Sequence, residues 1–158
     1  MRCDWRDCLA MVRRGEIDIM PDVARFPERE RLHRFGGEAV LQSWSYIVAR
    51  PADARGIVAI EDLGGRSIAV LSDSAQAREL RYLAETRSLG IDLVERARFG
   101  DVLGAVSAGA ADAGVVNSFY AEAHAEPEGL AVAPLLFQPT ALHFVYSPGV
   151  EARLIQRV

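Results

Sequence analysis

The chain has 158 residues, of which 50% are hydrophobic and 25% are charged, a composition typical of a globular domain rather than of a disordered or fibrous protein. Its 18 basic and 22 acidic residues give a formal net charge of −4, so it lacks the basic surplus of a nucleic-acid-binding protein, and we expect no nucleic-acid partner. No apolar run approaches the length of a membrane span.

The first elements are predicted from hydrophobic spacing and from residues that end helices and strands. Apolar residues recur at helical spacing over residues 5–12, and Gly15 ends this helix. A short buried strand follows at residues 17–20 and closes at Pro21. The charge run at residues 25–34 is interpreted as a solvated loop or a short helix.

The remaining elements alternate along the chain. Strands are predicted at residues 40–50, 67–71, 91–94, 113–116, 130–137 and 141–146, and helices at residues 60–63, 75–89, 102–108, 119–125 and from residue 150 onward. Pro139 separates the last two strands, and Asp73 with Gln76 forms a capping-box pattern before the 75–89 helix. This alternation predicts an α/β fold with a parallel-rich sheet and helices on both faces.

The cysteines and histidines suggest no metal or redox chemistry. Cys3 and Cys8 lie five residues apart, and on a helix they would occupy different faces, so we expect them not to pair. No Cys-x-x-Cys motif and no Cys/His cluster occurs in the sequence, so no metal and no cofactor is expected. His33, His124 and His143 are scattered, which favours surface or internally hydrogen-bonded histidines.

A short pattern of helix end, Gly-x-x-Asp and strand occurs twice. Gly15 and Asp18 form the first copy, and Gly109 and Asp112 form the second at the same offset. In each copy the glycine suits a left-handed helix end, and the aspartate stabilises the turn that leads into the strand. The repeat indicates two similar α/β lobes.

Polar residues follow two predicted strands at the points where helices begin. Ser74 and Gln76 come after the 67–71 strand, and Asn117 comes after the 113–116 strand. Ligands of parallel α/β sheets bind at the carboxyl ends of strands, where helix N-termini favour anions. These three residues are therefore candidate ligand contacts, or else simple helix caps.

Asp22, Trp44 and Ser45 are expected on the other side of the same crevice. Trp44 either presents an aromatic face to a solute or packs in the core. The sequence contains no Gly-x-Ser-x-Gly elbow, no Ser or Cys with an evident His partner and no Gly-rich phosphate loop. The residues predict a polar crevice without a reactive centre, which indicates a binding protein and not an enzyme.

Three segments resemble, in the right order, motifs of the type 2 periplasmic solute-binding proteins, of the extracellular solute-binding family 3 kind. Residues 15–24 with Pro27-Glu28-Arg29 resemble the first-lobe signature, residues 63–70 the second-lobe entry, and residues 109–117 a later glycine–aspartate–strand element. Residues 142–149 resemble the strand that returns to the first lobe. The resemblance implies two α/β lobes that close on a solute by hinge motion.

The resemblance also implies a domain organisation. It places a partial first lobe at residues 1–51, the second lobe at residues 52–138, and the return strand with a shortened C-terminal helix at residues 139–158, with strand crossings near residues 48–51 and 137–141. No signal peptide is visible, so the protein is either cytoplasmic or the sequence is not the whole chain. We expect a fragment of a periplasmic or extracytoplasmic protein, whose signal or anchor lies outside it.

Two positions depart from the amino-acid binders of this family. Those proteins hold the ligand carboxylate with an arginine and the amino group with an acidic residue, and the resemblance puts Ser45 and Asn117 at these positions. Ser74 keeps the family's serine or threonine at the start of the second-lobe helix. Because charge-assisted hydrogen bonds are about twice as strong as neutral ones, we expect a standard amino acid to bind weakly.

The sequences Pro21-Asp22-Val23-Ala24 with Pro27-Glu28-Arg29, and Val115-Val116-Asn117, are most similar to versions of the family that serve as extracytoplasmic sensors. The expected function is therefore a small-solute-binding sensory module, partnered with a membrane-bound sensor kinase or diguanylate cyclase. The alternative is the substrate-binding receptor of an ABC importer, whose partner is the permease. Less favoured are a LysR-type effector domain and a periplasmic dehydratase-like enzyme with Asp22 as its acid/base residue.

Overall fold

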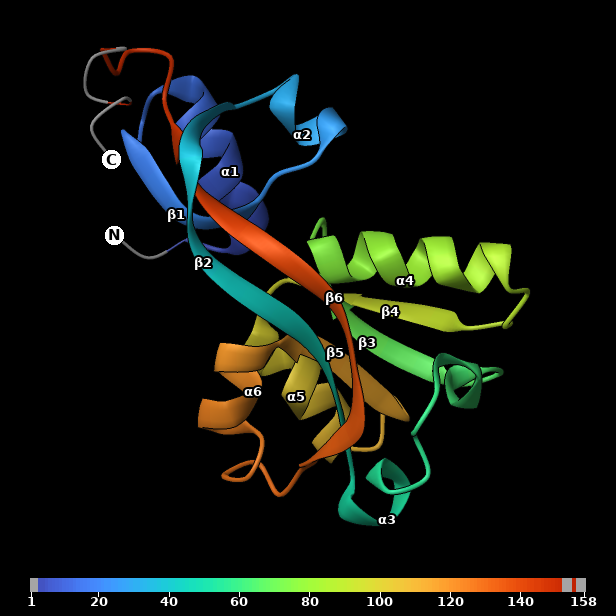
Figure 1. Ribbon diagram of the computed structural model, residues 1–158. Helices are drawn as coiled ribbons and strands as arrows, with labels where there is room; N and C mark the ends of the chain where they lie inside the picture. The colour runs from blue at the N-terminus through green and yellow to red at the C-terminus, as the bar shows by residue number, and fades with distance from the viewer. Residues whose placement is uncertain (1–2, 152–154, 156–158) are drawn as a thin grey trace. The chain divides into compact units, whose positions relative to one another are not determined.

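The computed structural model describes residues 3–151 and 155, and the chain divides into two compact units (Figure 1). One unit is the continuous segment 44–138, and the other combines residues 1–43 with residues 139–158. Strands β2 (Arg34–Ala49) and β6 (Ala131–Tyr146) each contribute to both units. The strand order is β1-β6-β2-β5-β3-β4, a mixed sheet that confirms the α/β class. The lobe boundary placed after Pro51 stays a prediction.

The strands of the 44–138 unit combine parallel and antiparallel pairing. Strand β3 (Ser67–Leu71) lies parallel to both β4 (Asp92–Arg96) and β5 (Ala113–Asn117). Strand β2 pairs antiparallel with β5. The carboxyl ends of β3 and β5 consequently meet at one edge of the sheet.

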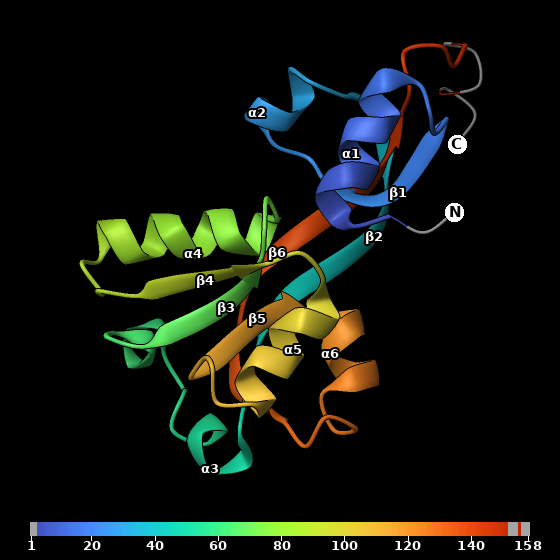
Figure 2. The ribbon, with the colours of Figure 1, turned by 180° about the vertical axis from the view of Figure 1, so that it is seen from behind.

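Helices cover both faces of this part of the sheet. Side chains alternate across a strand, so Ile68 and Val70 of β3 join one apolar cluster while Ala69 joins another. Helix α4 (Ala75–Thr86) covers the first face with α3 (Pro51–Ala54) and the short helix η1 (Ile60–Leu63), because buried residues of all three belong to the first cluster. Helices α5 (Phe99–Ser107) and α6 (Ser118–His124) cover the second face (Figure 2).

The other unit has a smaller core. Helix α1 (Trp5–Arg14) packs on β1 (Ile19–Ala24), which pairs antiparallel with β6, and α2 (Pro27–Glu30) follows. The buried cluster contains Leu9, Val12, Val23 and Val145. None of the helices in the described part of the chain has both the length and the apolar character that a membrane span requires.

Both copies of the repeat end a helix in the same way, as predicted. Gly15 and Gly109 have φ values of 77° and 74°, in the left-handed region that glycine adopts without steric cost. The N–H of each glycine donates to a carbonyl three residues earlier, and the next N–H donates five residues back, from Glu16 to Met11 and from Ala110 to Ala105. This is the hydrogen-bond pattern of a Schellman helix end.

Two prolines expected to end strands lie inside them, so those predictions are wrong. Strand β1 continues through Pro21, where a register shift between Met20 and Val23 interrupts the ladder and tolerates the missing N–H. Strand β6 continues through Pro139 as one strand. Gln138, the residue before this proline, has a φ of 52°.

The two cysteines form a disulfide, contrary to the sequence prediction. Helix α1 begins only at Trp5, so Cys3 lies before the helix and not on one of its faces. Its Cα atom is 5.5 Å from that of Cys8, within the range that a disulfide spans. The helix predicted from residue 150 falls, apart from residues 150, 151 and 155, outside the described residues.

Candidate functional site

The carboxyl ends of β3 and β5 bring together two helix starts in the 44–138 unit. Val70 lies opposite Val115 in the parallel ladder, so the two strands end side by side. Helix α4 begins four residues after β3 ends, and α6 begins directly after β5. This edge is where ligands of parallel α/β sheets bind.

Ser74 is the N-cap of α4. Its hydroxyl accepts a hydrogen bond of 3.1 Å from the N–H of Ala77, and its side chain is buried. The expected capping box of Asp73 and Gln76 is wrong, because Asp73 has a φ of 56° and lies one residue before the cap. Gln76 is buried in the first turn of the helix. Capping by Ser74 satisfies one N–H of the first turn of α4. The positive end of the dipole of this helix lies near the carboxyl end of β3.

Asn117 is the N-cap of α6 in the same manner. Its side-chain oxygen accepts a hydrogen bond of 2.7 Å from the N–H of Tyr120. Across the β2–β5 ladder, Asn117 lies opposite Ser45. The structure therefore shows the capping role for both Ser74 and Asn117, and ligand contact stays a prediction.

Ser45 is linked to the start of α4 through Gln138. The Ser45 side chain is fully buried, and its hydroxyl donates to Oε1 of Gln138 at 3.2 Å. Nε2 of Gln138 donates to the carbonyl oxygen of Ala75 at 3.4 Å. The half-buried amide of Gln138 thus joins β2, β6 and α4 at this edge.

Two aromatic side chains are exposed next to these polar groups. Trp44 is 39% exposed and Phe119 is 48% exposed, so the core-packing alternative for Trp44 is wrong. The N–H of Trp44 donates to the Ser118 hydroxyl at 3.4 Å, which places the two aromatic residues on neighbouring stretches of chain. Exposed aromatic faces beside hydroxyl and amide groups suit a small solute with both apolar and polar parts.

Asp22 belongs to the other unit. It is exposed in β1, with a φ of 60°, at the register shift of the strand. Of the six predicted site residues, five therefore lie in the 44–138 unit, and Asp22 alone lies outside it.

Arg29 is a buried cation that the sequence analysis missed. It was expected in a solvated charge run, yet it is only 5% exposed. Its Nη1 donates to the carbonyl oxygen of Ala24 at 3.0 Å, and its guanidinium lies 4.3 Å from the Phe26 ring centroid and 5.5 Å from that of Trp5. Stacking on aromatic rings lowers the cost of burying a guanidinium, which the spacing of charges alone does not reveal.

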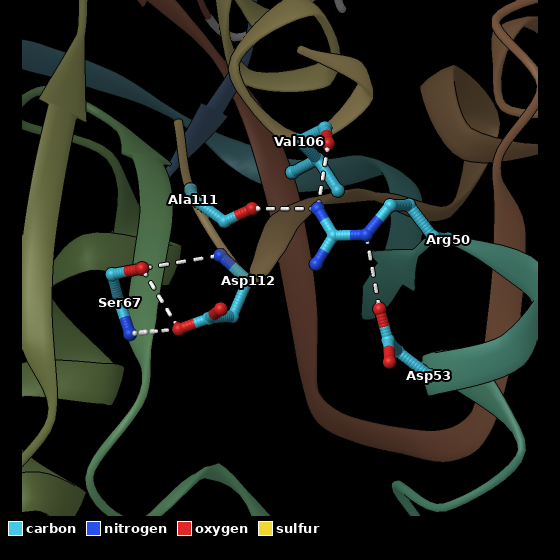
Figure 3. Close-up of polar contacts among 6 residues, drawn as sticks. All are labelled: Arg50, Asp53, Ser67, Val106, Ala111 and Asp112. Carbon is cyan, nitrogen blue, oxygen red and sulfur yellow. Dashed lines mark hydrogen bonds and ion pairs between the residues drawn. The ribbon is translucent and has the colours of Figure 1, made fainter. Parts of the chain in front are cut away.

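The amino ends of β3 and β5 carry a second polar cluster (Figure 3). Oδ2 of Asp112 accepts hydrogen bonds of 2.9 Å from both the backbone N–H and the hydroxyl of Ser67. The N–H of Asp112 lies 2.9 Å from the Ser67 carbonyl oxygen and 3.1 Å from its hydroxyl oxygen. The Ser67 backbone N–H and then its hydroxyl hold the pKa of Asp112 below its ordinary value, because both bonds favour the carboxylate.

Arg50 extends this cluster to the end of α5. Its Nη1 donates to the carbonyl oxygens of Val106 and Ala111 at 3.1 and 3.3 Å, and its Nε pairs with Asp53 at 3.0 Å (Figure 3). A cation beside the last carbonyls of a helix satisfies unpaired acceptors and complements the helix dipole. The amino-end cluster is therefore an internal support of the fold.

The described residues contain no group of three or more His, Cys, Asp or Glu side chains arranged to hold a metal ion. Of the histidines, His143 is buried, with Nδ1 at 3.3 Å from the carbonyl oxygen of Gly36 and its ring edge-on to Phe35.

Comparisons with known proteins identify the fold. No protein-family model and no curated protein matches the chain. An ancestral arginine-binding protein bound to arginine superposes with a TM-score of 0.85 at 18% identity, over 98% of this chain and 68% of that one. An amino acid ABC transporter substrate-binding protein from Streptococcus pneumoniae, bound to L-arginine, gives 0.83 at 18%, over 99% and 65%. An ancestral amino acid-binding protein, described as a precursor of cyclohexadienyl dehydratase, gives 0.82 at 21%, over 98% and 66%.

The chain has the periplasmic binding protein fold. It spans about two thirds of the length of these solved structures. Because the sequence identity is low, the likeness to these structures shows the fold alone.

Proposed function

We propose that this chain binds a small polar solute and serves as the substrate-binding component of an ABC importer. The observation that carries the proposal is the edge of the sheet where the caps of α4 and α6 adjoin the exposed Trp44. No charged side chain belongs to this set of Ser45, Ser74, Gln76, Trp44 and Asn117, so hydroxyl, amide and aromatic groups would make the contacts. The importer role draws its support from the fold neighbour described as an ABC transporter component.

The solute is proposed to be a neutral polar molecule. Neighbours of this fold are described as bound to arginine or glutamine. At the positions that we assign to the two charged amino-acid anchors, this chain has Ser45 and Asn117, and the Ser45 hydroxyl is already bonded to Gln138. Neutral hydrogen bonds compensate poorly for an ammonium and a carboxylate that lose their water, so free amino acids should bind weakly.

An extracytoplasmic location fits this function. Disulfides form and persist in oxidising compartments and are rare in the cytosol, and Cys3 and Cys8 are paired. The disulfide therefore supports an extracytoplasmic location independently of the likeness of fold.

The sensor role is a second candidate. It is favoured by the motif Pro21-Asp22-Val23-Ala24, which is similar to sensor versions of the family. A sensor and an importer receptor would bind the same solute, so binding data do not separate them. The gene sequence after the codon of Val158 separates the two roles. A membrane span followed by a kinase or cyclase domain would support the sensor and contradict the importer.

Calorimetric titration of the 158-residue chain with a panel of small solutes tests binding. The panel should contain L-arginine, L-glutamine and neutral polyols and amides of similar size. We expect saturable binding of a neutral member and weaker binding of both amino acids. Tighter binding of an amino acid would overturn the neutral-solute proposal, and no saturable binding of any member would count against the site.

The enzyme alternative has its own test. Asp22 is the one acid/base residue proposed for a dehydratase-like reaction. We expect no turnover of any bound solute, and equal binding by the Asp22→Asn variant at the 44–138 edge. Turnover that this variant abolishes while binding persists would establish an enzyme instead.

A further inference from the structure

The unit of residues 1–43 and 139–158 contains a cavity of about 190 Å³, which the proposed solute site does not use. Arg13, Arg31 and Arg34 line it, together with Glu30, His33 and Tyr146. Pockets for drug-sized ligands run from about 300 to 1,000 Å³, so this cavity suits a much smaller molecule.

The wall of the cavity carries a surplus of positive charge. Three of its side chains are arginines, and the carboxylate of Glu30 is already paired with Nε of Arg25 at 2.5 Å. This concentration occurs in a chain whose formal net charge is −4. A local basic cluster in an acidic protein attracts anions selectively.

One of the arginines is held in place at the wall. Nη1 of Arg34 donates to the carbonyl oxygens of Pro148 and Val150, at 3.1 and 2.9 Å. A guanidinium fixed by backbone carbonyls keeps its remaining donors in a set orientation, so less entropy is lost when they bind an oxyanion.

Two buried polar atoms of residues that line the cavity have no hydrogen-bond partner among the described residues: the Tyr146 hydroxyl and Nδ1 of His33. Tyr146 is only 4% exposed. Buried polar groups are nearly always paired, and an unpaired one calls for an explanation such as a ligand. Burial, and then the charges of Arg29 and Arg13, lower the pKa of His33.

We propose that this cavity is a binding site for a small oxyanion, of the size of phosphate, sulfate or a carboxylate group. Arg13 and Arg31 supply charge-assisted hydrogen bonds, and the Tyr146 hydroxyl donates a neutral one. The site lies within one unit and does not depend on the solute function proposed above.

Titration of the 158-residue chain with inorganic sulfate, and separately with phosphate, tests the proposal. Calorimetry at constant ionic strength, set with chloride, gives the affinity. We expect saturable binding that Arg31→Gln weakens about tenfold, since a charged partner is lost. Tyr146→Phe should weaken it about fivefold without lowering the melting temperature of the anion-free chain, because losing a buried hydroxyl that has no partner removes a desolvation cost.

Arg55→Gln is the matched control, because Arg55 is an exposed arginine of the other unit and its loss changes the net charge equally. It should leave anion affinity as in the unaltered chain. Three results would overturn the proposal: no saturable binding at tens of millimolar, equal weakening by Arg55→Gln and Arg31→Gln, or full affinity in both cavity variants.

Discussion

The two ends of the strands in the 44–138 unit use the same residue types for different purposes. At the amino ends, Ser67 and Asp112 bind each other through backbone and side-chain atoms. At the carboxyl ends, Ser74 and Asn117 each cap a helix, next to the exposed Trp44. A serine at a strand end is therefore no sign of function by itself; what distinguishes the carboxyl edge is its two helix starts and its exposed aromatic rings.

The comparison yields a rule that can be tested. Changes at the amino edge should lower stability and leave solute binding unaltered in the folded protein. Changes at the carboxyl edge should lower solute affinity by more than they lower stability.

Asp112→Ala should have the largest effect, a loss of about 2–3 kcal/mol in the free energy of unfolding. The variant removes the acceptor of two Ser67 donors, one of which is a backbone N–H at the start of β3. Denaturant unfolding followed by circular dichroism measures the loss. Unchanged stability would show that the amino edge does not support the fold.

Ser74→Ala and Asn117→Ala should each weaken solute binding by about 1–2 kcal/mol for each lost neutral hydrogen bond. Ser67→Ala is the matched control, because it removes a serine hydroxyl of the same sheet at the opposite edge. Calorimetry with the solute found in the panel measures all three. Equal loss of affinity in Ser67→Ala and Ser74→Ala would erase the distinction between the edges.

Acid below about pH 4 should reduce the support that Asp112 gives to the amino edge. Its folded pKa lies below the unfolded value of about 3.9, so its contribution is complete above that pH and disappears as the pH falls through the lower, folded pKa. The Asp112→Asn variant keeps a side-chain acceptor oxygen, but its amide does not take up a proton in this pH range. The unfolding free energy of this variant should fall less steeply below pH 4, and an identical slope would contradict the assignment.

Asp18→Ala should have the smallest effect, within about 0.5 kcal/mol of the unaltered chain. Asp18 is the counterpart of Asp112 in the repeat, but within the part of the chain that the structure describes its carboxylate accepts no hydrogen bond. Only its backbone oxygen is used, by the N–H of Ser147. A loss as large as that of Asp112→Ala would mean that the two copies are equivalent after all.

Local signals in the sequence predicted much of the fold. Gly15 and Gly109 mark helix ends because the left-handed conformation that ends a helix favours glycine, whatever the rest of the chain does. Ser74 and Asn117 were identified because each is a polar residue that can cap a helix and lies at a junction between a strand and a helix. Phe119 and Ser118 were overlooked, although they come directly after Asn117.

Features that depend on distant partners were not predictable. The hydrogen bond from Ser45 to Gln138 joins residues 93 positions apart, and no spacing rule connects them. The burial of Arg29 depends on the ring of Trp5, on another element. Pro21 lies inside a strand because the ladder shifts register there, which only the pairing with β6 reveals.

The division of the chain has a consequence for its synthesis on the ribosome. The 44–138 unit is one uninterrupted stretch, so all of it is translated before the last segment of β6. Ile19, in contrast, pairs with Tyr146, so β1 cannot pair with β6 until translation has reached Tyr146. The apolar side chains of β1 therefore remain without their β6 partners while residues 25–146 are translated, and an unpaired strand edge of this kind is prone to aggregate.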